Sequence, residues 1–258
     1  MERPSPSAVY SSLKGKVVLV TGGASGIGEA IVEAFVLQES RVLFLDIQDD
    51  AANSLVQRLR QPGRVPPEYF HCDLANTSEL QSVIEKILSA SPAIDVLVNN
   101  AGDDKRHKIE EVTSEFWDWC IQTNLKHQFF VTQAVLPGMR RAKRGSIINM
   151  SSIGWVIPST GIPIYVTAKA AIVGMTRALA HEVGTDSVRV NCVMPGAIST
   201  DKQRRLWFTE EYKKEILSRQ AIKRDIQPEE VAKLVLFLAS DESLAITNQS
   251  FVIDAGWV

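Results

Sequence analysis

Short apolar runs alternate along the chain with longer segments whose apolar residues recur every three to four positions. Continuous runs such as Val17-Val18-Leu19-Val20 are typical of parallel strands that helices cover on both faces. The pattern predicts strands at 16–20, 41–45, 69–72, 94–98, 146–150, 188–193 and 251–253, and helices at 27–37, 50–59, 77–89, 114–139, 168–183 and 228–239. This succession predicts an α/β fold with a parallel sheet flanked by helices, in the doubly wound, Rossmann-like arrangement.

The chain shows no internal repeat beyond this alternation, and no Pro/Gly-rich linker divides it. Its 258 residues fit one large α/β domain with a substantial core. The first residues are rich in Pro and Ser. We therefore expect a flexible N-terminal tail at 1–12 and a single domain at 13–258.

Composition excludes several classes of function. A net charge of -2 gives no broad positive field for nucleic acid or anionic lipid. No apolar run approaches the roughly 18 residues that span a bilayer, and the N-terminus lacks the apolar core of a signal peptide. Three scattered cysteines without CxxC spacing, and histidines that do not cluster with them, predict neither disulfides nor a metal site. We expect a cytoplasmic protein without nucleic-acid or membrane partners.

A glycine-rich segment, Thr21-Gly22-Gly23-Ala24-Ser25-Gly26-Ile27-Gly28, follows the first strand and opens the first helix. Glycines allow positive φ and close backbone approach, and the N–H groups of a helix N-terminus bind phosphate. The spacing is GxxxGxG rather than GxGxxG, and no Lys-Ser/Thr pair follows Gly28. Taken alone, the segment is also compatible with an ordinary tight turn. In its place after a strand, it indicates a dinucleotide site.

Asp46 ends the second strand, about 20 residues beyond the glycines. A carboxylate there would accept hydrogen bonds from the adenosine ribose hydroxyls and repel a 2′-phosphate. The sequence therefore predicts NAD rather than NADP. The alternative is that the acidic residues around Asp49 and Asp50 only cap a helix. Asp73-Leu74, after the third strand, fits the adenine pocket, although Asp73 is equally suited to capping the next helix.

Two further turns lie at strand ends, where ligands bind an open α/β sheet. Asn99-Asn100-Ala101-Gly102 follows the fourth strand, and its small and amide side chains suit close passage along a cofactor. Pro195-Gly196, followed by Thr200, fits the nicotinamide end of the site. Alone, the latter is an ordinary turn.

Tyr165 and Lys169 stand at i and i+4, on one face of a predicted helix. A nearby cation lowers a phenol pKa, as general-base chemistry near neutral pH requires. In isolation this spacing usually means a solvated helix face. Ser152, beyond the strand at 146–150, brings a hydroxyl to the same edge of the sheet. Asn124 either holds a water for proton relay or is a buried structural amide.

This ordered set resembles the short-chain dehydrogenase/reductase family over residues 14–258. The resemblance implies that Tyr165 is the catalytic acid/base, that Lys169 binds nicotinamide ribose and lowers the Tyr165 pKa, and that Ser152 orients substrate. It implies that Asn124 supports a water chain. It also implies that residues 13–258 form an NAD-binding catalytic domain with these cofactor contacts: Gly22, Ser25, Gly26, Ile27, Gly28, Asp46, Ile47, Asp73, Leu74, Asn100, Ala101, Gly102, Tyr165, Lys169, Pro195, Gly196, Ile198 and Thr200.

Other segments are similar to the bacterial aldose 1-dehydrogenases of this family, D-xylose 1-dehydrogenases among them. The similarity lies at 104–108, Trp155, 207–209 and 253–257. It implies oxidation of an aldose, D-xylose or another pentose, at C1 to the lactone. Within these regions, the expected substrate contacts are Asp104, His107, Ser152, Trp155, Tyr165 and Gln203, with Asp103, Arg106 and Trp207 as further wall residues. Carboxylates, amides and indole faces suit a sugar. The charged cluster fits surface ion pairs equally well.

The family resemblance also implies a homotetramer, with contacts around 116–130 and at the C-terminal segment. Two rival functions stay open. One is an NAD(P)-dependent carbonyl or secondary-alcohol oxidoreductase acting on a non-sugar substrate; Asp46 argues against its NADPH-dependent form, a carbonyl or acyl-carrier reductase. The other is an NAD-binding regulator without catalysis, which would be expected to lack the Tyr165–Lys169 pair.

Overall fold

A computed structural model describes residues 8–258. At its centre is one seven-stranded sheet in the order β3-β2-β1-β4-β5-β6-β7, and every neighbouring pair is parallel. The strands are β1 (Val17–Thr21), β2 (Arg41–Asp46), β3 (Glu68–His71), β4 (Val96–Asn99), β5 (Gly145–Met150), β6 (Val188–Pro195) and β7 (Ser250–Ile253). The strand order reverses direction between β1 and β4, which confirms the predicted doubly wound topology.

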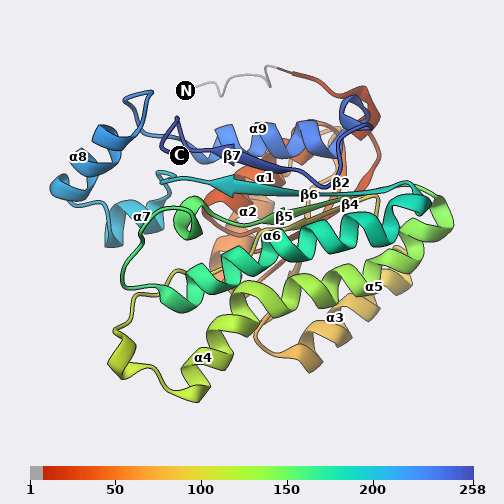
Figure 1. Cartoon of the computed structure of the whole chain (residues 1–258). Coiled ribbons are helices and arrows are strands. Elements are labelled where there is room, and N and C mark those ends of the chain that lie inside the picture. Colours follow the sequence, from red (N-terminus) through yellow and green to blue (C-terminus); the bar gives the residue numbers. More distant parts are fainter. Residues whose placement is uncertain (1–7) are drawn as a thin grey trace.

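Helices cover both faces of this sheet (Figure 1). Helices α1 and α9 lie above the sheet in that view, and α3, α4, α5 and α6 lie below it. Helices α7 and α8 lie beyond the end to which the β6 arrow points. The helices are α1 (Gly26–Leu37), α2 (Asp49–Leu59), α3 (Thr77–Ala90), α4 (Ser114–Ile121), α5 (His127–Ala142), α6 (Pro163–Val183), α7 (Asp201–Leu206), α8 (Glu210–Arg219) and α9 (Pro228–Ala239).

Each central strand sends alternate side chains into two separate apolar cores. From β1, Val18 and Val20 join the core beneath α1 and α9, whereas Leu19 joins the core with α3, α5 and α6. Phe44 and Leu43 divide in the same way on β2. Because both faces are buried, the strand sequences are continuously apolar, as expected for a parallel sheet between two helical layers.

The structure differs from the predicted elements in three places. The helix expected at 114–139 is α4 and α5 joined by a π-helical turn, η3 (Gln122–Lys126). Helix α6 begins at Pro163, five residues before the predicted start, because proline suits the first helical turn. Helices α7 and α8 were not predicted, although Thr200 and Thr209 cap them through side-chain hydrogen bonds.

The first described residues contact the domain. The Tyr10 amide donates to Oε1 of Gln38 at 2.7 Å, and Gln38 Nε2 donates to the carbonyl of Ala8. A 3₁₀ turn at Ser11–Leu13 then buries Leu13 in the α1/α9 core. These contacts join the chain around Tyr10 and Leu13 to the domain, and the flexible tail at 1–12 stays a prediction. Residues 1–7 lie outside the described residues.

Within residues 8–258, no helix is long and apolar enough to cross a membrane. The three cysteines, Cys72, Cys120 and Cys192, are buried free thiols. No group of three or more His, Cys, Asp or Glu side chains in this described range could hold a metal ion.

Candidate active site

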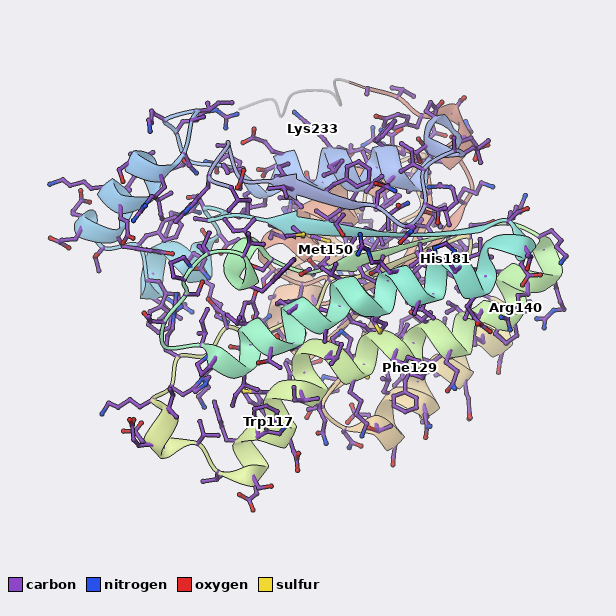
Figure 2. All side chains as sticks on the ribbon, viewed as in Figure 1. Trp117, Phe129, Arg140, Met150, His181 and Lys233 are labelled. Atoms are coloured by element: carbon purple, nitrogen blue, oxygen red, sulfur yellow. The ribbon has the colours of Figure 1, made fainter. Side chains whose placement is uncertain are left out.

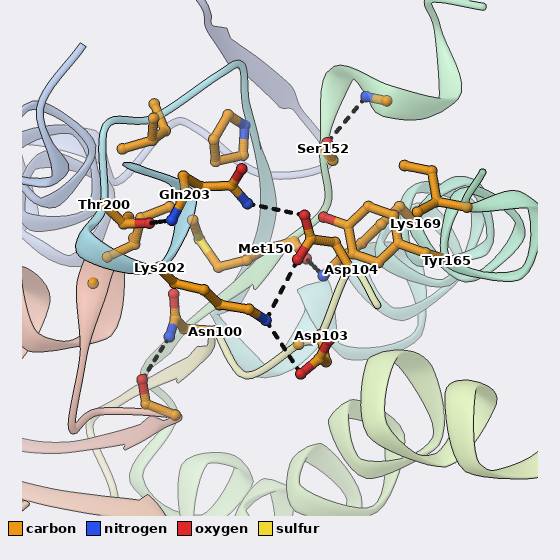
Figure 3. A pocket seen from close by; sticks show the side chains of 18 of the residues that line it. Asn100, Asp103, Asp104, Met150, Ser152, Tyr165, Lys169, Thr200, Lys202 and Gln203 are labelled. Carbon is orange, nitrogen blue, oxygen red and sulfur yellow. Dashed lines mark hydrogen bonds and ion pairs between the residues drawn. The ribbon is translucent and has the colours of Figure 1, made fainter. Parts of the chain in front are cut away.

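A cavity of about 840 Å³ runs along the carboxyl edge of the sheet, at the point where the strand order reverses. The turns after β1, β2, β4, β5 and β6 all contribute to its walls (Figure 3). All of the predicted cofactor-contacting positions line this one cavity. The structure therefore brings together segments that are up to about 180 residues apart, as the strand-end argument predicted.

The glycine turn packs so closely that side chains cannot be accommodated there. A Cβ on Gly28 would lie 1.8 Å from the carbonyl oxygen of Gly22, and a Cβ on Gly22 would lie 2.8 Å from Cα of Ala101. Gly22 also has a φ of +67°, in the left-handed region. Asn100 ties the turn to β4, since its Nδ2 donates to the carbonyls of Thr21 and Gly22.

The N-terminus of α1 opens into the same cavity. Ser25 is the N-cap residue, but its side chain makes no capping hydrogen bond, so the amides of the first turn have no side-chain acceptor. Free amides and the positive end of the helix dipole favour an anionic ligand. The close-packed glycines and this helix terminus together fit the pyrophosphate of a dinucleotide.

Asp46 lies at the end of β2, 5% exposed, and faces the cavity. Its carboxylate accepts hydrogen bonds from the backbone amides of Ala24 at 2.8 Å and Gln48 at 3.0 Å. The N-cap of α2 is Gln48, so Asp46 is not the cap of that helix. Asp46 thus fixes the glycine turn and presents a negative charge to the adenosine end of the site.

Asp73 and Leu74 line the cavity beside Asp46. The Asp73 carboxylate accepts from the amide of Ala75 at 2.9 Å, within its own turn. Helix α3 is capped instead by Asn76, whose side chain accepts from the Glu79 amide. The capping role that was the alternative for Asp73 therefore belongs to Asn76.

Three side chains of the expected catalytic set converge at the other end of the cavity. Lys169 is 3% exposed, and its ammonium donates to the carbonyl of Met150 at 2.9 Å and lies 5.4 Å from the centroid of the Tyr165 ring. Ser152 lies close enough to the Tyr165 phenol to lower its pKa. Tyr165 and Lys169 come from α6, and Ser152 from the end of β5, so rigid elements hold all three.

Burial is the main influence on both titrating groups. Burial and the charge of Asp104 raise the pKa of Tyr165 above its ordinary value, while the hydrogen bond with Ser152 and the charge of Arg106 oppose this. Burial lowers the pKa of Lys169 to about 8. We expected Lys169 to lower the pKa of Tyr165, but desolvation and Asp104 outweigh any such effect in the protein alone.

Asn124 lies in the π-helical turn η3 and is fully buried. Its Oδ1 accepts from the Asp103 amide at 2.8 Å, and its Nδ2 donates to the carbonyls of Asp103 and Cys120, each at 3.0 Å. A Cβ on Gly102 would come within 3.0 Å of this Oδ1 and 3.2 Å of the Lys169 ammonium. The Asn124 side chain therefore anchors the segment after β4 close to Lys169.

The wall facing the catalytic residues is polar. Gln203 Nε2 donates to Oδ2 of Asp104 at 2.9 Å, and the Lys202 ammonium lies 3.4 Å from Oδ1 of Asp104 and 3.2 Å from Oδ2 of Asp103. These contacts join the segment after β4 to α7 (Figure 3). Asp104 and Gln203 were predicted wall residues, whereas Lys202 was not.

Three other predicted wall residues lie elsewhere. The His107 ring packs 5.0 Å from the ring of Phe116, and its backbone amide bonds the carbonyl of Gly161. Trp155 is 37% exposed, and the guanidinium of Arg106 stacks 5.0 Å from the Trp207 ring. None of His107, Trp155 and Trp207 is among the residues that line the cavity, although Arg106 is.

An indole from the C-terminus occupies the wall instead. Trp257 lines the cavity and packs on the apolar cluster that includes Ile153 and Met194. The carboxylate of Asp254 fixes this end of the chain by accepting from the amides of Gly256 and Val258. Tyr212 of α8 also lines the cavity. Sequence reasoning missed Lys202 and Tyr212 because the segment after β6 was not recognised as helical.

Comparison with known proteins decides the family. Residues 22–258 match the family model described as "Enoyl-(Acyl carrier protein) reductase". The chain belongs to the short-chain dehydrogenase/reductase family. As a short-chain dehydrogenase/reductase, it is an oxidoreductase, and the predicted resemblance is confirmed.

Two similar relatives are named for sugars. The chain is 47% identical to "D-xylose 1-dehydrogenase" of Caulobacter vibrioides, over 97% of this chain and 99% of that protein. It is 43% identical to "Probable galactose dehydrogenase GalD" of Rhizobium meliloti, over 97% and 98%. A crystal structure of a 3-oxoacyl-[acyl-carrier protein] reductase with bound NAD, from Brucella melitensis, has a TM-score of 0.87, with 31% identity over 100% of this chain and 97% of that chain. The two relatives match this short-chain dehydrogenase/reductase over nearly its whole length, and the solved structure shares its fold.

Proposed function

We propose that this enzyme oxidises an aldose, D-xylose or a similar pentose, at C1 to the lactone with NAD. The observation that carries the proposal is that the Tyr165 phenol and the Ser152 hydroxyl face a cavity whose opposite wall holds Asp104 and Gln203. Names of two similar relatives, a D-xylose 1-dehydrogenase and a galactose dehydrogenase, support the same substrate class.

The cofactor site supports NAD over NADP. The glycine turn and the uncapped N-terminus of α1 would hold the pyrophosphate of the cofactor. Asp46 would accept hydrogen bonds from the hydroxyls of the adenosine ribose. Asp46 has no facing cation among its hydrogen-bond partners, which are the Ala24 amide and Gln48. The 2′-phosphate of NADP, bound beside Asp46, would therefore be repelled by a carboxylate charge that no cation among these partners offsets.

The catalytic residues fit acid/base work on an anomeric hydroxyl. Ser152 and Tyr165 would bind the oxygen on C1, and Tyr165 would accept its proton as the C1–O bond becomes a carbonyl. Bound NAD supplies the acceptor for the hydride that leaves C1. Lys169, buried at 3% exposure, would hold the nicotinamide ribose and place a positive charge 5.4 Å from the phenol ring.

The polar wall supports a sugar over an apolar alcohol as the substrate. Carboxylate and amide oxygens accept hydrogen bonds from sugar hydroxyls, and Asp104 and Gln203 bring one group of each kind together, with Gln203 Nε2 donating to Oδ2 of Asp104 at 2.9 Å. The Trp257 indole adds an aromatic surface on which the C–H face of a pyranose ring can pack. A steroid or acyl chain would offer no hydroxyls to the remaining acceptor sites of these groups.

The test is NADH absorbance with a matched substrate panel. D-Xylose, L-arabinose, D-galactose and D-fucose are compared with 2-propanol, cyclopentanol and a 3-hydroxyacyl ester, each with NAD and NADP. We expect an aldopyranose to give the highest kcat/KM with NAD. If every sugar fails while a simple alcohol or hydroxy ester is oxidised readily, the sugar assignment is wrong. If nothing turns over with either cofactor, a non-catalytic regulator takes its place.

We also propose a cytoplasmic homotetramer. Trp117 on α4 and Phe129 on α5 are each 44% exposed, on the two lower helices in Figure 2, and Val252 on β7 is equally exposed. Helices α4 and α5 follow one another through η3, and exposed apolar side chains that gather on one face are a feature of protein–protein contacts. Light scattering should give about four times the chain mass of 28.5 kDa. A mass of one chain at assay concentrations would contradict the assembly.

A further inference from the structure

The least expected contact in the cavity joins Lys202 to two carboxylates. Its ammonium lies 3.2 Å from Asp103 and 3.4 Å from Asp104, about 100 residues away in the chain. Thr200 caps α7 by accepting from the Gln203 amide and so fixes the helix on which Lys202 stands. The contact therefore bridges two segments that border the cavity from different strands.

The two carboxylates differ in surroundings. The Asp104 side chain is 17% exposed and also accepts from Gln203, whereas the Asp103 side chain is 36% exposed. Figure 3 shows the Asp104 carboxylate pointing toward the Tyr165 hydroxyl. Because solvent screens a partly buried charge less, Asp104 acts on Tyr165 more strongly than Asp103 does.

The charged groups around the phenol come from several elements. Asp103, Asp104 and Arg106 follow β4, Lys169 lies on α6 and Lys202 on α7. The negative charge of Asp104 opposes formation of the phenolate that proton acceptance requires. Lys202 is the cation placed directly against that carboxylate.

We propose that Lys202 is a positioning residue, which holds Asp104 against α7 and offsets the negative charge that Asp104 directs at the Tyr165 phenol. This inference rests on the proposed role of Tyr165 as the base. Under this proposal, the segment after β6, which carries Lys202, affects the proton transfer to Tyr165 as well as the shape of the cavity wall. The ion pair keeps the carboxylate in place for substrate hydroxyls without leaving its full charge beside the base.

The test compares the pH dependence of kcat/KM in four proteins, with saturating NAD and whichever alcohol or sugar the parent enzyme oxidises. In the plot of kcat/KM against pH, Lys202→Met should move the rising limb to higher pH by about half a unit or more. The reason is that the uncompensated Asp104 charge holds the proton on Tyr165. Lys202→Arg should restore the parent profile. Lys213→Met is the control, since Lys213 is also 42% exposed and paired with a carboxylate, that of Asp225.

The double variant Lys202→Met/Asp104→Asn separates charge from shape. Removing the Asp104 carboxylate should return the rising limb to the pH at which it stands in the parent enzyme, or to a lower pH, even if the KM for the substrate rises. If Lys202→Met lowers the rate without moving the limb, or if the double variant stays displaced, the inference is wrong. A Tyr165→Phe variant that keeps its rate would overturn the proposed base instead, so the two failures are distinguishable.

Discussion

The two halves of the cavity are built in different ways. The half that we propose for the cofactor is defined by backbone: the glycine turn packs against Ala101 with no room for a Cβ, and Asp46 is held by two backbone amides. The half that we propose for the substrate is defined by side chains of the segments after β4 and β6, such as Asp104 and Gln203, which contact each other. Close backbone packing allows few residue types, whereas a wall of side chains can change by single substitutions.

This difference predicts that changes in one half leave the other half's ligand largely unaffected. Substitutions at Asp46 should alter the choice between NAD and NADP and leave the sugar preference constant. Substitutions at Trp257 should alter the sugar preference and leave the choice of cofactor constant. Tyr165 stands where the halves meet and should affect turnover with every substrate.

The largest effect is expected at that junction. Tyr165→Phe removes the proton acceptor but keeps the ring, so kcat should fall by about 10²–10⁴-fold while NAD still binds. Stopped-flow or steady-state NADH absorbance gives the rate, and fluorescence titration gives the NAD affinity. A variant within threefold of the parent rate would remove Tyr165 from the mechanism.

A smaller effect is expected for cofactor choice. Asp46→Asn removes the charge yet leaves one acceptor oxygen, so kcat/KM with NADP should rise by on the order of 10-fold relative to NAD. Asp49→Asn is the control, because Asp49 bonds Tyr69 and His71 and is not among the residues that line the cavity. A parent enzyme that already prefers NADP would refute the account of Asp46, and altered sugar preference in Asp46→Asn would break the separation of the halves.

The smallest effect is expected at the aromatic wall. Trp257→Leu should raise the KM for the aldose by about 3- to 10-fold, since packing of an aromatic face contributes about 0.5–1.5 kcal/mol. The KM for NAD should stay the same. Trp155→Leu, outside the cavity lining, should change neither value. Equal effects of the two substitutions would mean that Trp257 only supports the fold.

What could be predicted from the sequence follows the same division. The apolar runs identified all seven strands, and the ends of these strands located Asp46, Asn100, Ser152 and Pro195 at one edge of the sheet. Buried parallel strands and glycine turns leave a strong local pattern because packing permits little else. The family roles of the catalytic residues, Asn124 included, stay predictions.

The substrate wall could not be predicted residue by residue. His107 and Trp155 have suitable side chains, yet His107 packs on Phe116 and Trp155 is not among the residues that line the cavity. Trp257 reaches the wall through a C-terminal turn that Asp254 holds, and Lys202 reaches it through a six-residue helix. Such placements depend on long-range packing. The Thr200 and Thr209 caps were the local signals that could have revealed α7 and α8.

The most direct test of the central claim, oxidation of an aldose at C1 with NAD, is isotope transfer. The enzyme is incubated with NAD and D-xylose that carries deuterium at C1, and both products are examined by mass spectrometry and NMR. The account predicts that the deuterium appears at C4 of the nicotinamide and that an unlabelled five-carbon lactone forms. Deuterium retained in the sugar product, or no reduction of NAD at all, would contradict it.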